Sequence, residues 1–254
     1  MITILSPAKT LDFTTKYNFD NYSVPEFLSE SECLITELKK IDVQGISNLM
    51  SLSPKLSELN FNRSNSWDIN FNESNARQSI LCFKGGVYVG LDVDSYSDDD
   101  LFYAQDSLRI LSGLHGLLRP LDLIKPYRLE MGTKLCTKKG KNLYGFWGDL
   151  MTESLNKSLK KINSNYLLNL ASNEYFSSIK TKKISASIID VKFLDKKNDK
   201  YKTISFFAKK ARGNMASYVI KNRINHPDKL KDFNGLGYSF DSSRSNQDSF
   251  VFIR

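Results

Sequence analysis

The order of apolar and polar positions divides the chain into short strands and amphipathic helices. Six runs of apolar, β-branched or aromatic residues have the length of strands, namely residues 2–5, 87–91, 166–172, 186–194, 201–207 and 249–252. Capping signals followed by helical spacing predict helices from residues 23–26 to about 38, from 53 onward, over 76–81, from 97 to about 110, from 142–145 to 162, and from 208 to about 225. With no internal repeat and no Pro/Gly-rich linker, we expect one α/β or α+β domain over residues 1–254, a mixed sheet flanked by helices.

Three segments of this pattern carry more specific expectations. In the helix that begins at Ser53-Pro54, Leu56 and Leu59 lie on one face, which predicts the side that is buried. From Leu111 to Gly132, repeated glycines and prolines exclude a long helix. The polar run 195–200 between two strand-like segments predicts a hairpin turn.

Three of the predicted strands end at a group of polar or basic residues. The side chains of these groups are hydroxyls, cations and one carboxylate, namely Ser6, Lys9 and Thr10, then Ser172 and Glu174, then Lys209, Lys210 and Arg212. If the three strands are parallel, their carboxyl ends meet along one edge of the sheet, where open α/β sheets bind their ligands. We therefore expect a positively charged cleft at the strand ends that binds phosphate.

The third group places three cations in the first turns of a predicted helix. The helix dipole disfavours positive charge there by about a few tenths of a kcal/mol per residue. An anion bound at this point would offset that cost. The alternative is that Lys209 and Lys210 are solvated and that Arg212 pairs with a structural carboxylate.

A second set of candidates surrounds Lys84 and Arg128. Lys84 precedes two glycines, which allow the backbone to approach a ligand closely. Extended spacing puts Arg128 and Glu130 on one face, where they form either a structural ion pair or a site for phosphate or sugar. Two aromatic residues accompany these groups, namely Tyr88 and Tyr127.

Composition places the chain among globular proteins of a reducing compartment. Hydrophobic residues make up 41% and aromatic residues 12% of the 254 residues, which excludes a disordered chain. No apolar run reaches the roughly 18 residues of a membrane span and no secretory signal is present, so we expect a cytoplasmic protein. The few cysteines and histidines lack the spacing of a disulfide framework or a metal site, and they are Cys33, Cys82, Cys136, His115 and His226. We expect no metal and no cofactor, a surface cap at His226, and an exposed His115 between its glycines.

The net charge of +8 is unevenly distributed along the chain. Between Lys138 and Lys231 there are 21 Lys and Arg against 7 Asp and Glu, whereas the remainder carries 15 against 21. A basic carboxyl half indicates a surface that meets polyanions. The alternative is a general abundance of lysine spread over solvated faces.

Several short motifs occur in one order along nearly the whole chain. They are Ser-Pro-Ala-Lys-Thr-Leu-Asp (6–12), Phe-Lys-Gly-Gly-Val-Tyr (83–88), Leu-Ser-Gly-Leu-His-Gly-Leu-Leu-Arg-Pro-Leu-Asp (111–122), Pro-Tyr-Arg-Leu-Glu-Met-Gly (126–132), Asn-Leu-Ala-Ser (169–172) with Glu-Tyr-Phe (174–176), and Lys-Lys-Ala-Arg-Gly (209–213). Together they resemble the bacterial peroxide stress protein YaaA family. The resemblance implies a cytoplasmic protein that limits intracellular iron during peroxide stress, one unusual α/β fold with a positively charged cleft, and DNA binding.

The resemblance also implies a helix-hairpin-helix-like element, which maps onto Leu111–Arg119. Gly113 and Gly116 are three residues apart in this chain, whereas the usual hairpin has two glycines separated by one residue. Gly86 stands where relatives often carry Asp, which removes one acid from the group around Lys84.

The leading hypothesis is a DNA-binding protein of the peroxide stress response that protects DNA, with no membrane association and no obligate protein partner. The residues expected to hold DNA phosphates are Ser6, Lys9, Thr10, Lys84, Tyr88, Arg119, Tyr127, Arg128, Ser172, Lys209, Lys210 and Arg212. The alternative is an enzyme that acts on a nucleotide or a nucleic-acid base, by glycosidic cleavage or base exchange, with Glu130, Glu174 and Lys9 as catalytic candidates. Direct iron sequestration is a third hypothesis, which the lack of clustered ligands opposes.

Overall fold

The chain starts in the middle of its main sheet. In the computed structural model, which describes residues 1–254, β1 (Ile2–Leu5) has a neighbouring strand on each side, and its four side chains are buried. A strand that is buried on both faces is typical of a parallel sheet covered by helices.

The main sheet is mixed, and its parallel strands bring their carboxyl ends to one edge. Its other strands are β5 (Leu108–Ser112), β6 (Gly116–Leu118), β8 (Tyr166–Asn169), β9 (Ser187–Lys197), β10 (Lys200–Lys202), β11 (Ser239–Phe240) and β12 (Ser249–Ile253). The spatial order is β11-β12-β9-β8-β1-β5-β6, with β10 paired to β9. Four pairings are parallel, β1 with β5 and with β8, β8 with β9, and β9 with β12. β6, β10 and β11 pair antiparallel with their neighbours.

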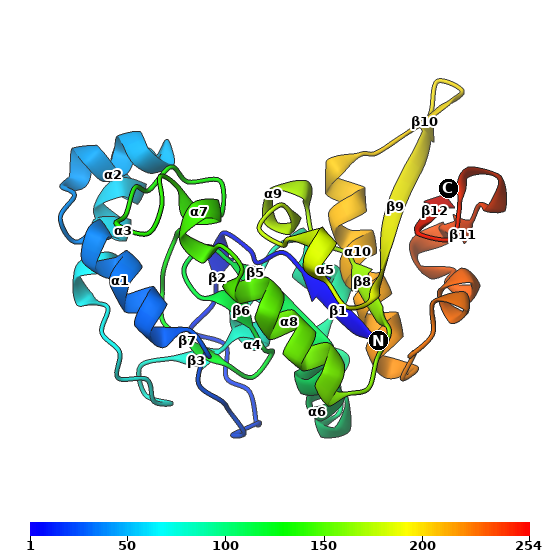
Figure 1. Cartoon of the computed structure of the whole chain (residues 1–254), viewed down its shortest axis with the longest axis horizontal. Coiled ribbons are helices and arrows are strands. Elements are labelled where there is room, and N and C mark those ends of the chain that lie inside the picture. The colour runs from blue at the N-terminus through cyan, green and yellow to red at the C-terminus, as the bar shows by residue number, and fades with distance from the viewer.

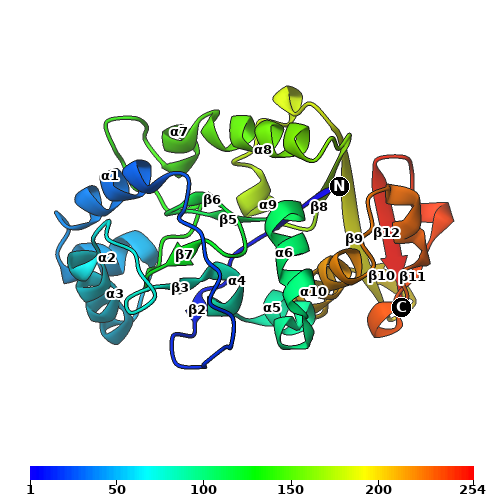
Figure 2. The ribbon, with the colours of Figure 1, turned by 90° about the horizontal axis from the view of Figure 1, so that it is seen from below.

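Helices cover both faces of this sheet. Figure 2 shows α8 (Leu150–Lys161) on one face, and α6 (Asp98–Ser107) and α10 (Ser205–Lys221) on the other. A separate group lies at one end of the molecule in Figure 1, namely α1 (Leu28–Leu38), α2 (Val43–Met50) and α3 (Pro54–Ser66). None of the helices combines the length and the apolar composition that crossing a lipid bilayer requires.

Short elements connect these layers. Two small antiparallel ribbons pair β2 (Thr10–Leu11) with β4 (Phe83–Lys84), and β3 (Arg77–Gln78) with β7 (Leu123–Ile124). The remaining helices are α4 (Ser79–Cys82), α5 (Gly86–Leu91), α7 (Leu143–Trp147) and α9 (Asn173–Phe176), with the 3-10 helices η1 (Val93–Ser95), η2 (Thr181–Lys183), η3 (Pro227–Asp232), η4 (Gly235–Gly237) and η5 (Ser242–Arg244).

One hydrophobic core joins all of these parts. A single cluster of 59 buried residues includes Leu34 of α1, Ile4 of β1, Met215 of α10 and Phe252 of β12, so the end group and the sheet belong to one domain. The prediction of a single mixed α/β domain, with a mixed sheet flanked by helices, is therefore confirmed.

Two segments predicted as strands are wholly or partly helical. Residues 87–91 form most of α5, because α5 packs against α10 and this packing overrides the β-type side chains. Of the segment 201–207, only its start is extended, and α10 begins at Ser205. The third polar group of the sequence therefore follows a helix start and not the end of a parallel strand. The hairpin turn is confirmed, with Asn198 and Asp199 at its tip.

Three predicted helices differ from the structure in extent or orientation. The helix from residue 97 ends at Ser107, because Leu108–Ser112 joins the sheet as β5. The helix over 142–162 is interrupted at Gly148, which has φ +50°. In α3 the buried residues are polar, namely Ser57, Asn60 and Ser64, whereas Leu56 and Leu59 are exposed. Ser57 and Ser64 donate to carbonyls one turn back, which satisfies their hydroxyls without water.

Candidate functional site

A cavity of about 830 Å³ lies at the carboxyl ends of β1 and β8. Ser6 follows β1 and Ser172 follows the end of β8, so parallel pairing brings them together. The backbone N–H of Ser172 donates to the Ser6 hydroxyl at 2.9 Å, and the two hydroxyl oxygens are 3.3 Å apart. The walls are formed by Ser6, Pro7, Ala8, Lys9, Thr10, Lys84, Gly85, Gly86, Val87, Tyr88, Glu130, Leu170, Ser172, Asn173, Glu174, Tyr175, Lys192, Thr203, Lys209 and Arg212.

Two predicted cations share one carboxylate at the cavity wall. Glu130 lies 2.7 Å from the ammonium of Lys9 and 3.0 Å from the guanidinium of Arg128. The predicted Arg128–Glu130 ion pair is thus confirmed, but Arg128 itself does not line the cavity. The Nε of Arg128 is buried without a hydrogen-bond partner, whereas the Lys9 side chain is 63% exposed. Lys9 is therefore free to turn toward a ligand, while Arg128 holds Glu130 in place.

Two cations from the first turns of α10 reach the cavity without any partner. Lys209 and Arg212 both line it, and neither side chain forms an ion pair or a hydrogen bond within the protein. Arg212 is half-buried, and burial lowers the pKa of its guanidinium. The alternative in which a structural carboxylate pairs with Arg212 is wrong. An unpaired, half-buried guanidinium is suited to an anionic ligand, since charge-assisted hydrogen bonds to phosphate are the strong ones.

A close crossing of α5 and α10 brings these cations to the cavity. A Cβ atom at Gly213 would lie 1.7 Å from the carbonyl oxygen of Val87, and one at Gly90 would lie 1.9 Å from the carbonyl oxygen of Lys210. Only glycine permits this approach, because any side chain would overlap with backbone of the facing helix. Gly86, at the start of α5, lies close to a side chain of α10, since a Cβ atom there would be 3.1 Å from the Cβ of Lys209.

Lys84 reaches the cavity from β4. The pairing of β2 with β4 sets Lys84 opposite Thr10, and its ammonium donates to the Tyr17 hydroxyl at 2.9 Å, with Asp12 at 3.9 Å. Partial burial by itself lowers the pKa of Lys84. The hydrogen bond to Tyr17 and the nearby carboxylates more than offset it, so the pKa is raised overall. Lys84 therefore stays charged at neutral pH.

One carboxylate and one tyrosine of the cavity, Glu174 and Tyr88, are anchored by the backbone. Glu174 is exposed and accepts from the backbone N–H of Gly132 at 2.9 Å. The Tyr88 hydroxyl donates to the carbonyl of Ser6 at 3.2 Å, and burial raises the pKa of Tyr88 well above its usual value. Cationic side chains outnumber carboxylates among the lining residues, with Lys9, Lys84, Lys192, Lys209 and Arg212 against Glu130 and Glu174.

Four predicted phosphate-binding residues do not line this cavity, namely Arg128, described above, and Arg119, Tyr127 and Lys210. Arg119 pairs with the buried carboxylate of Asp122 at 2.8 Å and donates to the carbonyl of Val24. Tyr127 is buried, with its hydroxyl 2.8 Å from that of Ser112. Lys210 follows Lys209 on α10 but does not line the cavity. Arg119 and Tyr127 thus contribute to the packing of the fold, and Lys210 lies on another face of α10.

Sequence reasoning missed Lys192, Thr203 and Tyr175, which line the same cavity. Alternate residues of a strand face the same side of a sheet, and from Ile189 to Phe193 the buried positions of β9 alternate with more exposed ones. That alternation separates Lys192 from its apolar neighbours, so the signal for Lys192 was present in the sequence. Tyr175 is placed by the short helix α9, which no periodicity could reveal.

The segment expected to form the helix-hairpin-helix-like element has no helices. Leu111–Arg119 contains the end of β5, a turn and β6, which pair antiparallel. Gly113 instead allows the backbone of Leu129 to approach closely, since a Cβ there would lie 2.2 Å from the carbonyl oxygen of Leu129. Two short helices flank a glycine turn elsewhere, at Ser79–Leu91, where α4 and α5 are separated by Phe83–Gly85 and Gly85 has φ +141°. This second segment forms part of the cavity wall.

The two histidines differ in environment. His115 is buried and not exposed, and burial lowers its pKa to about 3, so it is neutral; Ser31 lies 3.0 Å from its Nδ1. His226 is exposed and accepts from the N–H of Asp228, which confirms the predicted cap. The structure brings no three His, Cys, Asp or Glu side chains together as metal ligands.

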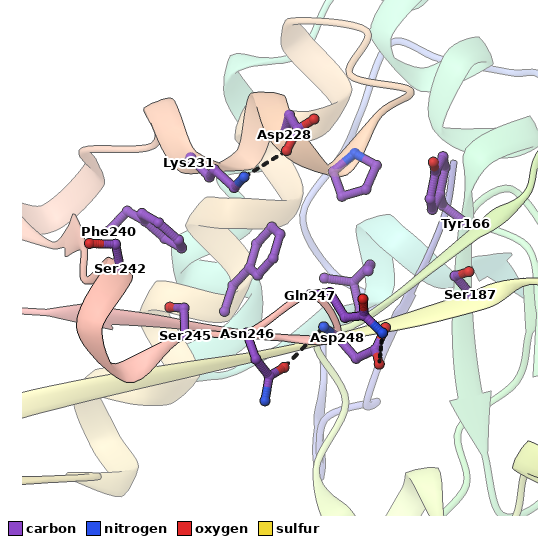
Figure 3. Close-up of a pocket in the computed structure, with 13 residues that line it drawn as sticks. Tyr166, Ser187, Asp228, Lys231, Phe240, Ser242, Ser245, Asn246, Gln247 and Asp248 are labelled. Carbon is purple, nitrogen blue, oxygen red and sulfur yellow. Dashed lines mark hydrogen bonds and ion pairs between the residues drawn. The ribbon is translucent and has the colours of Figure 1, made fainter.

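A second hollow of about 540 Å³ lies at the amino ends of β8, β9 and β12. Figure 3 shows Lys231 paired with Asp228 at its rim, at 2.6 Å. The ammonium of Lys231 also lies over the rings of Phe240 and Phe250. Lys231, the one cation that lines this hollow, is thus already neutralised. None of the predicted phosphate-binding residues lines the hollow. The larger cavity at the carboxyl ends is the candidate site.

Comparison with known families agrees with the extent of this single domain. A family model described as peroxide stress protein YaaA matches residues 1–244, which is nearly the whole chain. The match includes every residue that lines the cavity.

Proposed function

Because the chain belongs to the peroxide stress protein YaaA family, we propose that it serves the peroxide stress response by binding DNA through phosphate contacts in the cavity. Lys209 and Arg212 carry the proposal, since both are unpaired cations that face a cavity at strand ends. Ser6 and Ser172 add hydroxyl groups to the same wall. Phosphate contacts of this kind position DNA without reading its sequence, so binding is independent of base sequence.

The size of the cavity limits what enters it. A volume of about 830 Å³ is that of a small-molecule site, and a duplex about 20 Å across cannot be enclosed in it. The phosphates of one strand therefore enter the cavity while the rest of the duplex lies across its mouth. In this proposal the protein acts in the cytoplasm, and the limitation of iron during peroxide stress follows indirectly from the protection of DNA.

Neutralising the unpaired guanidinium tests this function. Arg212→Gln should weaken equilibrium binding of a labelled 20-base-pair duplex about tenfold or more at low salt, because one charge-assisted hydrogen bond is worth about 1.5–3 kcal/mol. Arg223→Gln is the matched control, since Arg223 lies just beyond the end of α10, outside the cavity, and pairs with Asp100. Equal affinities of the two variants would refute the assignment of the cavity.

A second candidate function is supported by Glu130. This carboxylate is held between Lys9 and Arg128, faces the cavity, and is not needed by a passive phosphate site. An enzyme acting on a nucleotide or a base would use such a fixed acid or base. A titration with a free 5′-mononucleotide in place of the duplex separates the two functions. An enzyme of this class binds the mononucleotide saturably, whereas a DNA-binding protein requires several phosphates in a row.

A further inference from the structure

The hairpin formed by the end of β9 and by β10 extends beyond the body of the molecule. β9 pairs with β8 up to Asp190 and with β12 up to Leu194, and from Asp195 onward its partner strand is β10, apart from one hydrogen bond that the N–H of Lys196 donates to the carbonyl of Arg254. Figure 1 shows this hairpin rising above the rest of the molecule at the upper right. We call residues 195–202 the ribbon. Its tip, Asn198–Asp199, has φ of 52° and 57°, as in the tight turns that match the twist of a two-stranded ribbon.

The free lysines of the ribbon lie on one of its faces, because Lys202 lies opposite Asp195, two residues before Lys197, and alternate pairs of a ladder share a face. Lys196 lies opposite Tyr201, and Lys197 lies opposite Lys200. Lys197, Lys200 and Lys202 are exposed and have no carboxylate partner, whereas Lys196 pairs with Asp199 at 3.2 Å. The other carboxylate, Asp195, is buried and bonded to Tyr238 and Arg254. Three lysine charges are thus left without compensation on a projecting two-stranded element.

The ribbon continues the wall of the cavity. Lys192 and Thr203, at its base, both line the cavity. Lys192 and Lys196 are an even number of residues apart on β9, so they share one face of the strand. From Lys192 to Lys197 the strand advances about 17 Å at about 3.3 Å per residue, which is the length of about five base pairs. The ribbon therefore extends outward from the cavity wall, with Lys192 and Lys196 on one face and the free Lys197, Lys200 and Lys202 on the other.

We propose that the ribbon is a second DNA contact, which lies in or along a groove of the duplex whose strand enters the cavity. The major groove, about 12 Å wide, admits a two-stranded β-ribbon, and the face that carries Lys197, Lys200 and Lys202 can then meet the phosphates along the groove. This inference rests on the proposed function. It adds that the partner is a duplex and not an isolated nucleotide, since the ribbon contacts phosphates that the cavity does not reach.

The test compares two triple variants of equal charge. In the ribbon variant, Lys197, Lys200 and Lys202 are each replaced by Gln. In the control variant, three other exposed lysines without ion pairs are replaced by Gln, namely Lys55, Lys160 and Lys229. Binding of a labelled 20-base-pair duplex is measured from low to moderate salt for both variants and for the unmodified chain, and thermal unfolding shows that both variants remain folded.

The ribbon variant should bind the duplex at least about tenfold more weakly at moderate salt. Its slope of log affinity against log salt should be smaller by about 2–3 units, because each lost phosphate contact removes about 0.9 units. The control variant should change the slope by less than about one unit. If both variants change affinity and slope equally, the ribbon proposal is overturned while the cavity proposal stands. If the unmodified chain does not bind duplex even at low salt, both proposals fail.

Discussion

The guanidinium of Arg212 differs from the other arginines of the predicted site in having no acidic neighbour. Arg119 pairs with Asp122, and Arg128 pairs with Glu130, whereas Arg212 faces a cavity without an ion pair. The spacing of Arg128 and Glu130 predicted their pairing, because alternate residues of extended chain share a face. Local spacing also separates Arg119 from Arg212, since Asp122 follows Arg119 by three residues, whereas the acidic residues nearest to Arg212 in the sequence are Asp199 and Asp228.

The buried imidazole of His115 makes the stability of the fold depend on pH. Burial lowers its pKa to about 3, so the unfolded chain, with a pKa near 6.5, binds one proton more over the interval between these values. Stability contributed by neutral His115 is complete above about pH 6.5 and declines as the pH falls toward 3. Between pH 7 and pH 4.5 the loss is about 2–3 kcal/mol in the free energy of unfolding.

Denaturant unfolding at these two pH values measures this loss. His115→Gln should reduce the difference in unfolding free energy between pH 7 and pH 4.5 by about 2 kcal/mol. His226→Gln is the control, because His226 is exposed and should leave the difference unchanged. The same acid sensitivity in the chain with and without His115 would contradict the assignment.

At the scale of elements, the crossing of α5 and α10 decides where the basic residues lie. Gly213→Ala places a methyl group where the Val87 carbonyl oxygen is 1.7 Å away, so the two helices must separate. Overpacking of this kind should lower the free energy of unfolding by about 1–3 kcal/mol. Gly145→Ala is the matched control, because its nearest neighbouring atom is 3.4 Å from the built Cβ and its φ is negative. Denaturant melts that place both variants at equal stability would show that the crossing is not tight.

Contacts between segments distant in the sequence explain which elements were predicted poorly. The apolar runs at 2–5 and 249–252 were predicted as strands correctly, because their neighbours in the sheet favour the same structure. The run 87–91 has strand-like residues but forms α5, since contact with α10 outweighs local preference. Likewise the helix from residue 97 ends at Ser107 because the next residues pair with β1, a partner about 100 positions earlier in the chain.

At the scale of the whole molecule, the cavity joins segments from both ends of the chain. Ser6, Lys84, Glu130, Ser172 and Arg212 line one space, although they were predicted in separate groups. Parallel pairing of β1 with β8 brings Ser6 and Ser172 together. The others depend on loops and helix contacts that periodicity does not encode. The sequence therefore predicts groups of polar and basic residues at the ends of secondary-structure elements. That these groups converge on one cavity, and that Arg119 and Tyr127 do not line it, follows only from the fold.

The salt dependence of duplex affinity tests the central claim most directly, because it counts the phosphate charges that the protein neutralises. With the unpaired Lys192, Lys209 and Arg212 of the cavity, and the three free lysines of the ribbon, log affinity should fall linearly with log salt with a slope of about −5, because each neutralised phosphate contributes about −0.9. The measurement is an equilibrium titration of a labelled 20-base-pair duplex at several salt concentrations. A slope near zero, or no binding at low salt, would contradict the account.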